Sequence, residues 1–301
     1  MERVDEIATA LVADVSGRVA VTARLERMTF RAGIAAFQRM RLTAQGVRTF
    51  RSSMEVAVSV DGEDPATGRR WRSSDALLTV VGLDDGGRPV PLPQLVPGSA
   101  AERAAFAEAG ERRARRGSVG RDAGLALPSA VGAMDADRLS LERCSRIVPN
   151  EGAGDLGRAG AGWVLAIADE LAAVTASRHA GLPTVTAAVD GVAFARPAPV
   201  GDIVVLRSYL TASFRSSMEV CVEVWLRGRY ARREAPLAVC AFTYVALGPD
   251  ERPAAVPAFQ PQGLREETLR RQAAERHALV RGPAAAGFGP GSQAVSGPEG
   301  E

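Results

Sequence analysis

Lysine is absent from this sequence, so all 37 basic residues are arginine, set against 35 Asp and Glu residues. The absence excludes a P-loop lysine, a kinase-type lysine and a lysine Schiff base. Histidine is nearly as scarce, with His179 and His277 alone in 301 residues, which leaves little material for a His-rich metal site or a His-based triad. We therefore expect neither a metal nor a cofactor. The net charge of +2 provides no electrostatic case for binding nucleic acid or an anionic membrane.

Cysteine is also rare, and Cys144, Cys221 and Cys240 form no CxxC pair, which indicates a reducing compartment and no zinc ribbon. The first residues are charged where a signal peptide would need an apolar stretch. The most apolar run, residues 163–176, contains two acids and is too short to span a bilayer. From these absences we expect a cytoplasmic protein.

A repeat with an offset of 164 residues organises the chain. Residues 49–56, Thr-Phe-Arg-Ser-Ser-Met-Glu-Val, recur at 213–220 with Ser in place of the first Thr. The same offset, with no gap from residue 5 to residue 116, aligns further pairs that include Asp5 with Asp169 and Thr22 with Thr186. Matches of this number in one register predict two copies of one fold.

Composition predicts where the copies begin and end. The first repeat spans residues 1–116 and the second spans 144–281, separated by residues 117–143, whose Gly, Ala, Ser and Asp content is typical of a linker. Residues 282–301 have little apolar content to bury, and we expect them to be disordered. The second repeat has about 20 residues before its Asp-Glu pair that the first lacks, so we expect the first repeat to be clipped at its front edge and degenerate.

The second repeat predicts one long helix followed by strands. Residues 163–178 contain no helix breaker and are apolar nearly all round, which is typical of a buried helix. Gly160 and Gly162 precede this helix, and His179 and Gly181 supply a cation and a stop signal at its end. Strands are predicted at 184–195, 203–212, 217–225 and 238–247, and a charged helix at 266–280. Periodicity supports a duplicated α+β unit, and a buried helix before an antiparallel meander is the order of a hotdog fold.

Several short motifs of the second repeat occur in one order. They are Gly162-Trp163, Asp169-Glu170, Thr184-Val-Thr-Ala-Ala-Val-Asp190-Gly191, Phe194-Ala-Arg196-Pro197-Ala-Pro-Val-Gly201-Asp202 and Ser216-Ser217-Met218-Glu-Val. This series closely resembles acyl-CoA thioesterases of the hotdog superfamily, in the cytosolic (brain-type) acyl-CoA hydrolase group. The likeness covers residues 145–280 well and 5–116 weakly. It implies a tandem (double) hotdog, each an antiparallel sheet wrapped round a central helix, that hydrolyses fatty acyl-CoA to free fatty acid and CoA.

The resemblance also implies a site at the interface of the two repeats, where a helix acid of one copy faces a loop Asn and helix N-terminal amides of the other. Asp169 matches the acid, as does Asp5 in the first repeat, and Asn150 matches the loop Asn. We expect Asp169 to be the principal acid, because the residues around it are intact, with Asp5 and Asn150 forming a second site.

An acid buried in an apolar helix has a raised pKa and can act as a general base towards water, although direct attack by the carboxylate remains open. Backbone amides at the helix start near Gly162 are expected to stabilise the oxyanion. CoA presents phosphates, for which arginine is the natural partner, and Arg196, Arg215 and Arg51 are candidates, of which we favour Arg196 and Arg215.

Two other functions stay open on the sequence. One is a catalytically decayed acyl-CoA-binding protein, because the first repeat has lost part of the pattern. The other is a hotdog enoyl-CoA hydratase, whose chemistry is expected to use a His–Asp pair, and no histidine stands near Asp169 or Asp5 in the sequence. As partners we expect the acyl-CoA substrate and, from the resemblance, further copies of the chain in a homo-oligomer, with no nucleic acid and no membrane.

Overall fold

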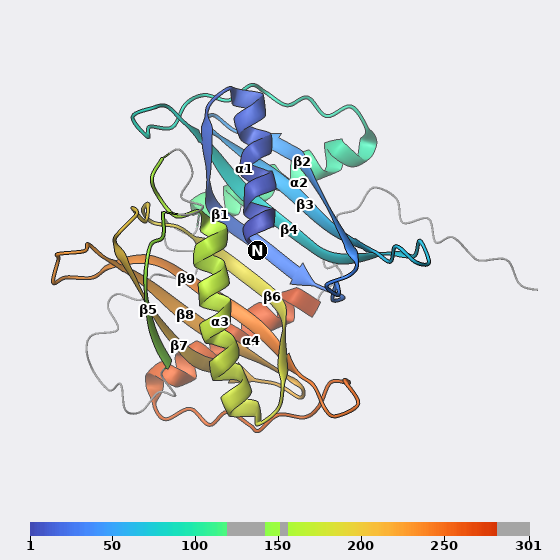
Figure 1. Ribbon diagram of the computed structural model, residues 1–301, viewed down its shortest axis with the longest axis vertical. Helices are drawn as coiled ribbons and strands as arrows, with labels where there is room; N and C mark the ends of the chain where they lie inside the picture. Colours follow the sequence, from blue (N-terminus) through green and yellow to red (C-terminus); the bar gives the residue numbers. More distant parts are fainter. Residues whose placement is uncertain (119–141, 151–155, 282–301) are drawn as a thin grey trace, which may run out of the picture.

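The structure, a computed structural model, describes residues 1–118, 142–150 and 156–281. The predicted disordered tail at 282–301, and residues 119–141 of the predicted linker, lie outside the described residues. The two repeats form one nine-stranded antiparallel sheet with the strand order β2-β3-β4-β1-β6-β9-β8-β7-β5 (Figure 1). The predicted class, two α+β units of helix and antiparallel sheet in tandem, is confirmed and is consistent with a double hotdog.

Both repeats follow one order of elements. The first consists of α1 (Glu2–Ser16), β1 (Val19–Phe30), β2 (Arg39–Thr49), β3 (Ser53–Glu63), β4 (Arg70–Leu83) and α2 (Ala100–Ser118). The second consists of β5 (Glu142–Ile147), α3 (Ala161–Ala180), β6 (Thr184–Ala193), β7 (Ile203–Ser213), β8 (Ser217–Arg227), β9 (Ala235–Ala246) and α4 (Leu264–Arg281). The elements predicted in the second repeat agree with these bounds to within three residues at each end.

Strand β5 is an element that the sequence did not indicate, because its six residues neither alternate nor run apolar. It pairs with the outer edge of β7, where Glu142 lies opposite Ser208 and Ile147 lies opposite Ile203. In the described part of the first repeat no strand covers the corresponding edge of β2. The two repeats therefore differ at the two ends of the sheet.

Helices α1 and α3 lie on the same face of the sheet (Figure 1). Each buries a stripe of residues spaced by four: Val4, Ala8 and Val12 in α1, and Ala168, Ala172 and Ala176 in α3. Both end at a left-handed glycine, Gly17 with φ 62° and Gly181 with φ 64°, as the stop signal predicted for α3. None of the described helices combines the length and the apolarity needed to span a bilayer.

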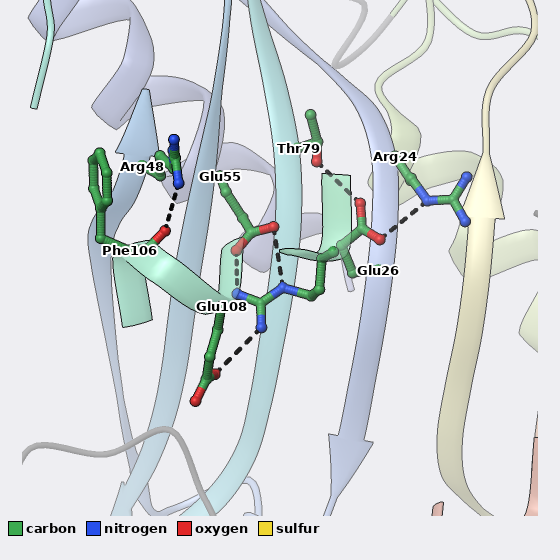
Figure 2. A network of polar contacts seen from close by, with 8 residues as sticks. Arg24, Glu26, Arg48, Glu55, Thr79, Phe106 and Glu108 are labelled. Atoms are coloured by element: carbon green, nitrogen blue, oxygen red, sulfur yellow. Dashed lines mark hydrogen bonds and ion pairs between the residues drawn. The ribbon is translucent and has the colours of Figure 1, made fainter. Parts of the chain in front are cut away.

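Helices α2 and α4 cover the opposite face of the sheet. Each is held to the sheet by an ion pair that occurs in both repeats. Glu55 in β3 is buried, and its Oε1 lies 2.5 Å from Nη2 of Arg112 in α2. At the corresponding place in the second repeat, Oε1 of Glu219 lies 2.6 Å from Nη2 of Arg276 in α4. Figure 2 shows the network around Glu55. The glutamate of the shared Ser-Met-Glu-Val motif therefore anchors the outer helix of each repeat.

The repeats join where β1 pairs with β6, with Arg24 opposite Ala193 and Thr29 opposite Ala188. We call this line the seam. Because the sheet is continuous across it, α1 and α3 meet on the inner face with their N-terminal ends towards each other (Figure 1).

Candidate active site

The N-terminal ends of α1 and α3 touch at the seam. A Cβ atom at Gly162 would lie 2.6 Å from Cα of Glu2 and 2.8 Å from Cβ of Asp5, so a side chain at this position would collide with α1. Only glycine allows the two backbones to approach this closely. The expectation that Gly162 precedes the helix was wrong, because α3 begins at Ala161. Its place in the first turn leaves its N–H without an intrahelical partner.

The Asp5 carboxylate accepts a hydrogen bond from the Gly162 N–H across the seam. Its side chain is 8% exposed, and its Oδ2 accepts a hydrogen bond of 2.8 Å from the Gly162 amide. A Cβ atom at Gly160 would lie 2.9 Å from the same oxygen, so both glycines bring the start of α3 close to the carboxylate. The N-cap residue of α3, Gly160, provides no side-chain cap. Asp5 thus provides the negative charge that the positive end of the helix dipole favours.

The other oxygen of Asp5 has no such bond. Among the described residues, Oδ1 of Asp5 and Oγ1 of Thr22 in β1 are both buried without a hydrogen-bond partner. Burial raises the pKa of the Asp5 carboxyl above its ordinary value, and the neighbouring Thr22 hydroxyl and Gly162 amide oppose this shift. A buried polar atom without a partner costs free energy, and two together are typical of a site that receives a water or a ligand.

Asp5 and Thr22 line a cavity of about 440 Å³ between the repeats. Its apolar walls include Val19, Val21, Val81 and Leu83 from the first repeat, and Val164, Phe194 and Leu237 from the second. The half-buried Arg158 and the exposed Arg196 line it as well. The cavity therefore combines a buried acid, apolar walls and two arginines that reach towards solvent.

Asp169 stands at the position equivalent to Asp5 but has different partners. Its Oδ1 accepts hydrogen bonds of 2.6 Å from the Tyr244 hydroxyl and 2.8 Å from the Thr186 hydroxyl. Burial raises the pKa of Asp169, and these two hydroxyl groups oppose the shift. With the offset of 164, Thr22 corresponds to Thr186, but Val80 corresponds to Tyr244. The first repeat therefore lacks the tyrosine that binds the acid in the second.

The structure brings together part of the predicted site. Asp5, the Gly162 backbone and Arg196 meet at the seam. Asn150 is exposed, immediately before residues that lie outside the described ranges, and is not among the residues lining this cavity. Arg215 is exposed in the turn between β7 and β8 and does not line it either.

Sequence reasoning missed Thr22, Gly160 and Arg158 as site residues. A signal for the threonine was present, since Thr22 and Thr186 each follow the aligned acid by 17 residues. Gly160 and Arg158 carried no such signal, because their neighbours in the site belong to the other repeat.

Comparison with known proteins finds relatives of this chain. The family profile described as "Thioesterase superfamily" matches residues 157–231. Acyl-coenzyme A thioesterase 11 of Mus musculus is 29% identical over 276 residues, which cover 87% of this chain and 46% of that protein. The chain therefore spans about half the length of the mouse relative.

A second relative comes from a bacterium. An uncharacterised acyl-CoA thioester hydrolase of Zymomonas mobilis is 38% identical over 101 residues, which cover 34% of this chain and 68% of that protein. Among solved structures, an acyl-CoA hydrolase of Staphylococcus aureus in complex with butyryl-CoA and CoA is 29% identical with a TM-score of 0.44, covering 47% of this chain and 86% of that one.

Proposed function

Because the chain belongs to the acyl-CoA thioester hydrolases of the thioesterase superfamily, we propose that it hydrolyses fatty acyl-CoA to a free fatty acid and CoA in the cavity at the seam. The acyl-CoA thioesterase family expected from the sequence is confirmed, and the narrower brain-type group stays a prediction. One observation carries the proposed site. The buried Asp5 has one oxygen bound to the Gly162 amide, and the other lies beside the Thr22 hydroxyl, close enough for that hydroxyl to lower the pKa but without a hydrogen bond of normal geometry.

In this proposal Asp5 acts as the general base. Its Oδ2 is held by Gly162, and Oδ1, which lies beside the Thr22 hydroxyl, accepts a proton from a water molecule that enters from the cavity. That water attacks the thioester carbonyl carbon, the C–S bond breaks, and the proton returns from Asp5 to the leaving CoA thiolate. Burial raises the pKa of the Asp5 carboxyl and therefore the basicity of its carboxylate, which suits it to activating water.

The developing oxyanion needs donors that Asp5 does not already occupy. The Gly162 amide, expected from the sequence to serve this purpose, donates to Asp5 Oδ2. We assign the role to the remaining first-turn amides of α3, of which Ala161 lines the cavity, and to the Thr22 hydroxyl. The helix dipole of α3 then acts on the acid and the oxyanion at the same place.

The contacts favour Asp5 over Asp169, which the sequence had ranked first. Asp169 Oδ1 accepts its two side-chain hydrogen bonds from hydroxyl groups of its own repeat, those of Tyr244 and Thr186. Asp169 is also not among the residues lining the cavity at the seam. We assign it a structural role that ties α3 to the sheet.

The two alternative functions have different support. A hydratase would need a histidine at the acid, yet His179 contacts the Pro257 carbonyl and His277 stacks on Phe214, and neither lines the cavity. An acyl-CoA-binding protein without turnover would use the same cavity, so activity alone separates it from the proposal.

The test measures release of free CoA thiol from a panel of acyl-CoAs of increasing chain length, with Asp5→Asn and Asp169→Asn as matched variants. We expect turnover by the wild type and a fall in kcat/KM of about 10²- to 10⁴-fold in Asp5→Asn, the usual contribution of a general base. Asp169→Asn should retain turnover. Loss of turnover in Asp169→Asn with an active Asp5→Asn would reverse the assignment, and binding without turnover in the wild type would support the binding protein.

Assembly of several chains stays a prediction. Light scattering of the purified chain after size-exclusion chromatography measures it directly, and a mass of one chain would contradict it.

A further inference from the structure

The turn between β8 and β9 concentrates positive charge at one point of the surface. It projects from the body of the molecule, and we call residues 228–233 the hairpin tip (Figure 1). Arg229, Arg232 and Arg233 are all exposed in it. In the part of the chain that the structure describes, none of the three forms an ion pair with an acid. The tip therefore presents a local cluster of cations to solvent.

The acids closest to the hairpin tip do not balance this charge. Glu234, which follows the tip, pairs with Arg207 and lies 4.0 Å from Nη1 of Arg227. Asp202 is half-buried, and its Oδ1 accepts a hydrogen bond of 3.2 Å from the backbone N–H of Arg229. That bond fixes the base of the tip to the start of β7. Three exposed cations therefore stand against one half-buried acid.

The equivalent turn of the first repeat forms without these side chains. With the offset of 164, Pro65 takes the place of Arg229, and Ala66 takes the place of Tyr230. The strands before the two turns end at equivalent residues, Glu63 in β3 and Arg227 in β8. Folding of the hairpin therefore does not require a basic and aromatic tip, which indicates that the tip serves a contact outside the chain.

Two exposed apolar side chains accompany the charge. Tyr230 in the tip is 93% exposed, and Ile147 at the end of β5 is 61% exposed. Ile147 lies opposite Ile203, and Ile203 lies opposite Arg227 at the base of the hairpin. Because directly paired residues of neighbouring strands share a face, Ile147 borders the hairpin. Aromatic and aliphatic side chains next to cations are the composition that binds the interface of an anionic membrane.

We propose that the hairpin tip docks the chain on an anionic lipid surface, with Tyr230 and Ile147 at the level of the headgroups and the tip arginines on the lipid phosphates. A projecting tip can reach a flat surface, and a nucleic acid would offer phosphates without an apolar layer for Ile147. The expectation of no membrane partner rested on the net charge of +2. Attraction to a charged surface acts within a Debye length, about 8 Å at physiological salt, so the local cluster decides it.

The hairpin leads back to the cavity at the seam. Leu237, shortly after the tip, lines that cavity, and its carbonyl accepts a hydrogen bond of 2.9 Å from the Ala195 N–H. Docking would therefore bring the cavity close to a surface that takes up acyl chains. This consequence rests on the proposed function, whereas the docking itself does not.

Co-sedimentation of the full chain with unilamellar vesicles measures docking without any turnover. The wild type should sediment with vesicles of phosphatidylcholine and phosphatidylglycerol, and it should stay in solution with phosphatidylcholine alone. Arg229→Gln, Arg232→Gln and Arg233→Gln combined should lower the partition coefficient about fivefold for each arginine, or about 100-fold in all. Added salt should weaken sedimentation of the wild type. Tyr230→Ser keeps every charge and should also weaken it.

The matched control combines Arg18→Gln, Arg41→Gln and Arg69→Gln, which remove the same charge from exposed positions of the first repeat and should leave sedimentation unchanged. Thermal unfolding checks that each variant is folded. Equal losses in the two triple variants would attribute binding to net charge and overturn the inference, as would a wild type that does not sediment with anionic vesicles. Binding of duplex DNA without vesicle binding would assign the tip to nucleic acid instead. A chain that hydrolyses no thioester but sediments as expected would refute the proposed function and sustain this inference.

Discussion

The amide of Gly162 in the second repeat donates a hydrogen bond of 2.8 Å to the carboxylate of Asp5 in the first, so the start of one helix is capped by the other. The equivalent acid, Asp169, receives its bonds from Tyr244 and Thr186 instead. Two acids aligned by the repeat therefore have different surroundings, since Asp5 lines the cavity at the seam and Asp169 is held by two hydroxyl groups.

Gly162→Ala should damage both stability and activity. The added Cβ would lie 2.6 Å from Cα of Glu2, so α1 or α3 must shift. We expect the free energy of unfolding to fall by about 1–3 kcal/mol, the usual cost of overpacking, with a loss of kcat because the bond to Asp5 is displaced. Denaturant unfolding and thiol release measure the two effects. Gly33→Ala, with no atom within 4 Å of its Cβ, is the control and should leave both unchanged.

Tyr244→Phe should affect stability and spare activity. The hydroxyl donates to Oδ1 of Asp169 at 2.6 Å, and its removal leaves a largely buried carboxylate with one side-chain donor fewer. We expect a loss of about 1–3 kcal/mol in the free energy of unfolding, with kcat/KM retained. The control is Tyr230→Phe, because Tyr230 is 93% exposed. A large drop in kcat/KM for Tyr244→Phe would show that Asp169 takes part in the reaction.

Asp5→Asn should stabilise the fold at neutral pH. The carboxyl has an ordinary pKa of 3.8 in the unfolded chain, and burial raises its pKa in the folded chain. At a pH between the unfolded and the folded pKa, the folded state therefore binds more protons than the unfolded state. Stability therefore falls as pH rises through this window, and the penalty persists above it. Asn carries no charge and can still accept the Gly162 N–H through its carbonyl oxygen.

Thermal unfolding across pH tests this sign. The melting temperature of Asp5→Asn should exceed that of the wild type at neutral pH, and the difference should shrink as pH falls towards 3.8. Asp14→Asn, at an exposed position of α1, is the matched control. A lower melting temperature for Asp5→Asn at neutral pH would mean that the ionised carboxylate is net stabilising.

The duplicated outer ion pairs should contribute to stability in both repeats. Glu55→Gln removes the charge that faces Arg112, and Glu219→Gln does the same for Arg276. Since each glutamate is buried, we expect each variant to lose about 1–3 kcal/mol of unfolding free energy. Arg70→Gln breaks an ion pair whose arginine is 62% exposed and should cost about 1 kcal/mol or less. Equal losses in all three variants would contradict the argument from burial.

Much of the architecture could be predicted from local patterns. The apolar helix at 163–178 and the alternating strand at 217–225 became α3 and β8, because helix and strand periodicities depend on neighbouring residues. Strand β5 escaped prediction, since the neighbour that stabilises it, β7, is about 60 residues away in the chain.

The repeat in the residue pattern was enough to predict that the chain is duplicated, that each copy carries an acid in a helix, and that glycines stand at the start of the helix that became α3. Which acid lies beside the cavity at the seam became clear only from the contacts between the two folded repeats. That choice depends on Tyr244 reaching Asp169 where Val80 cannot reach Asp5, and on Gly162 meeting Asp5 across the seam. Contacts of this kind join residues from 75 to 157 positions apart, and their geometry exists only once both repeats have folded into one sheet.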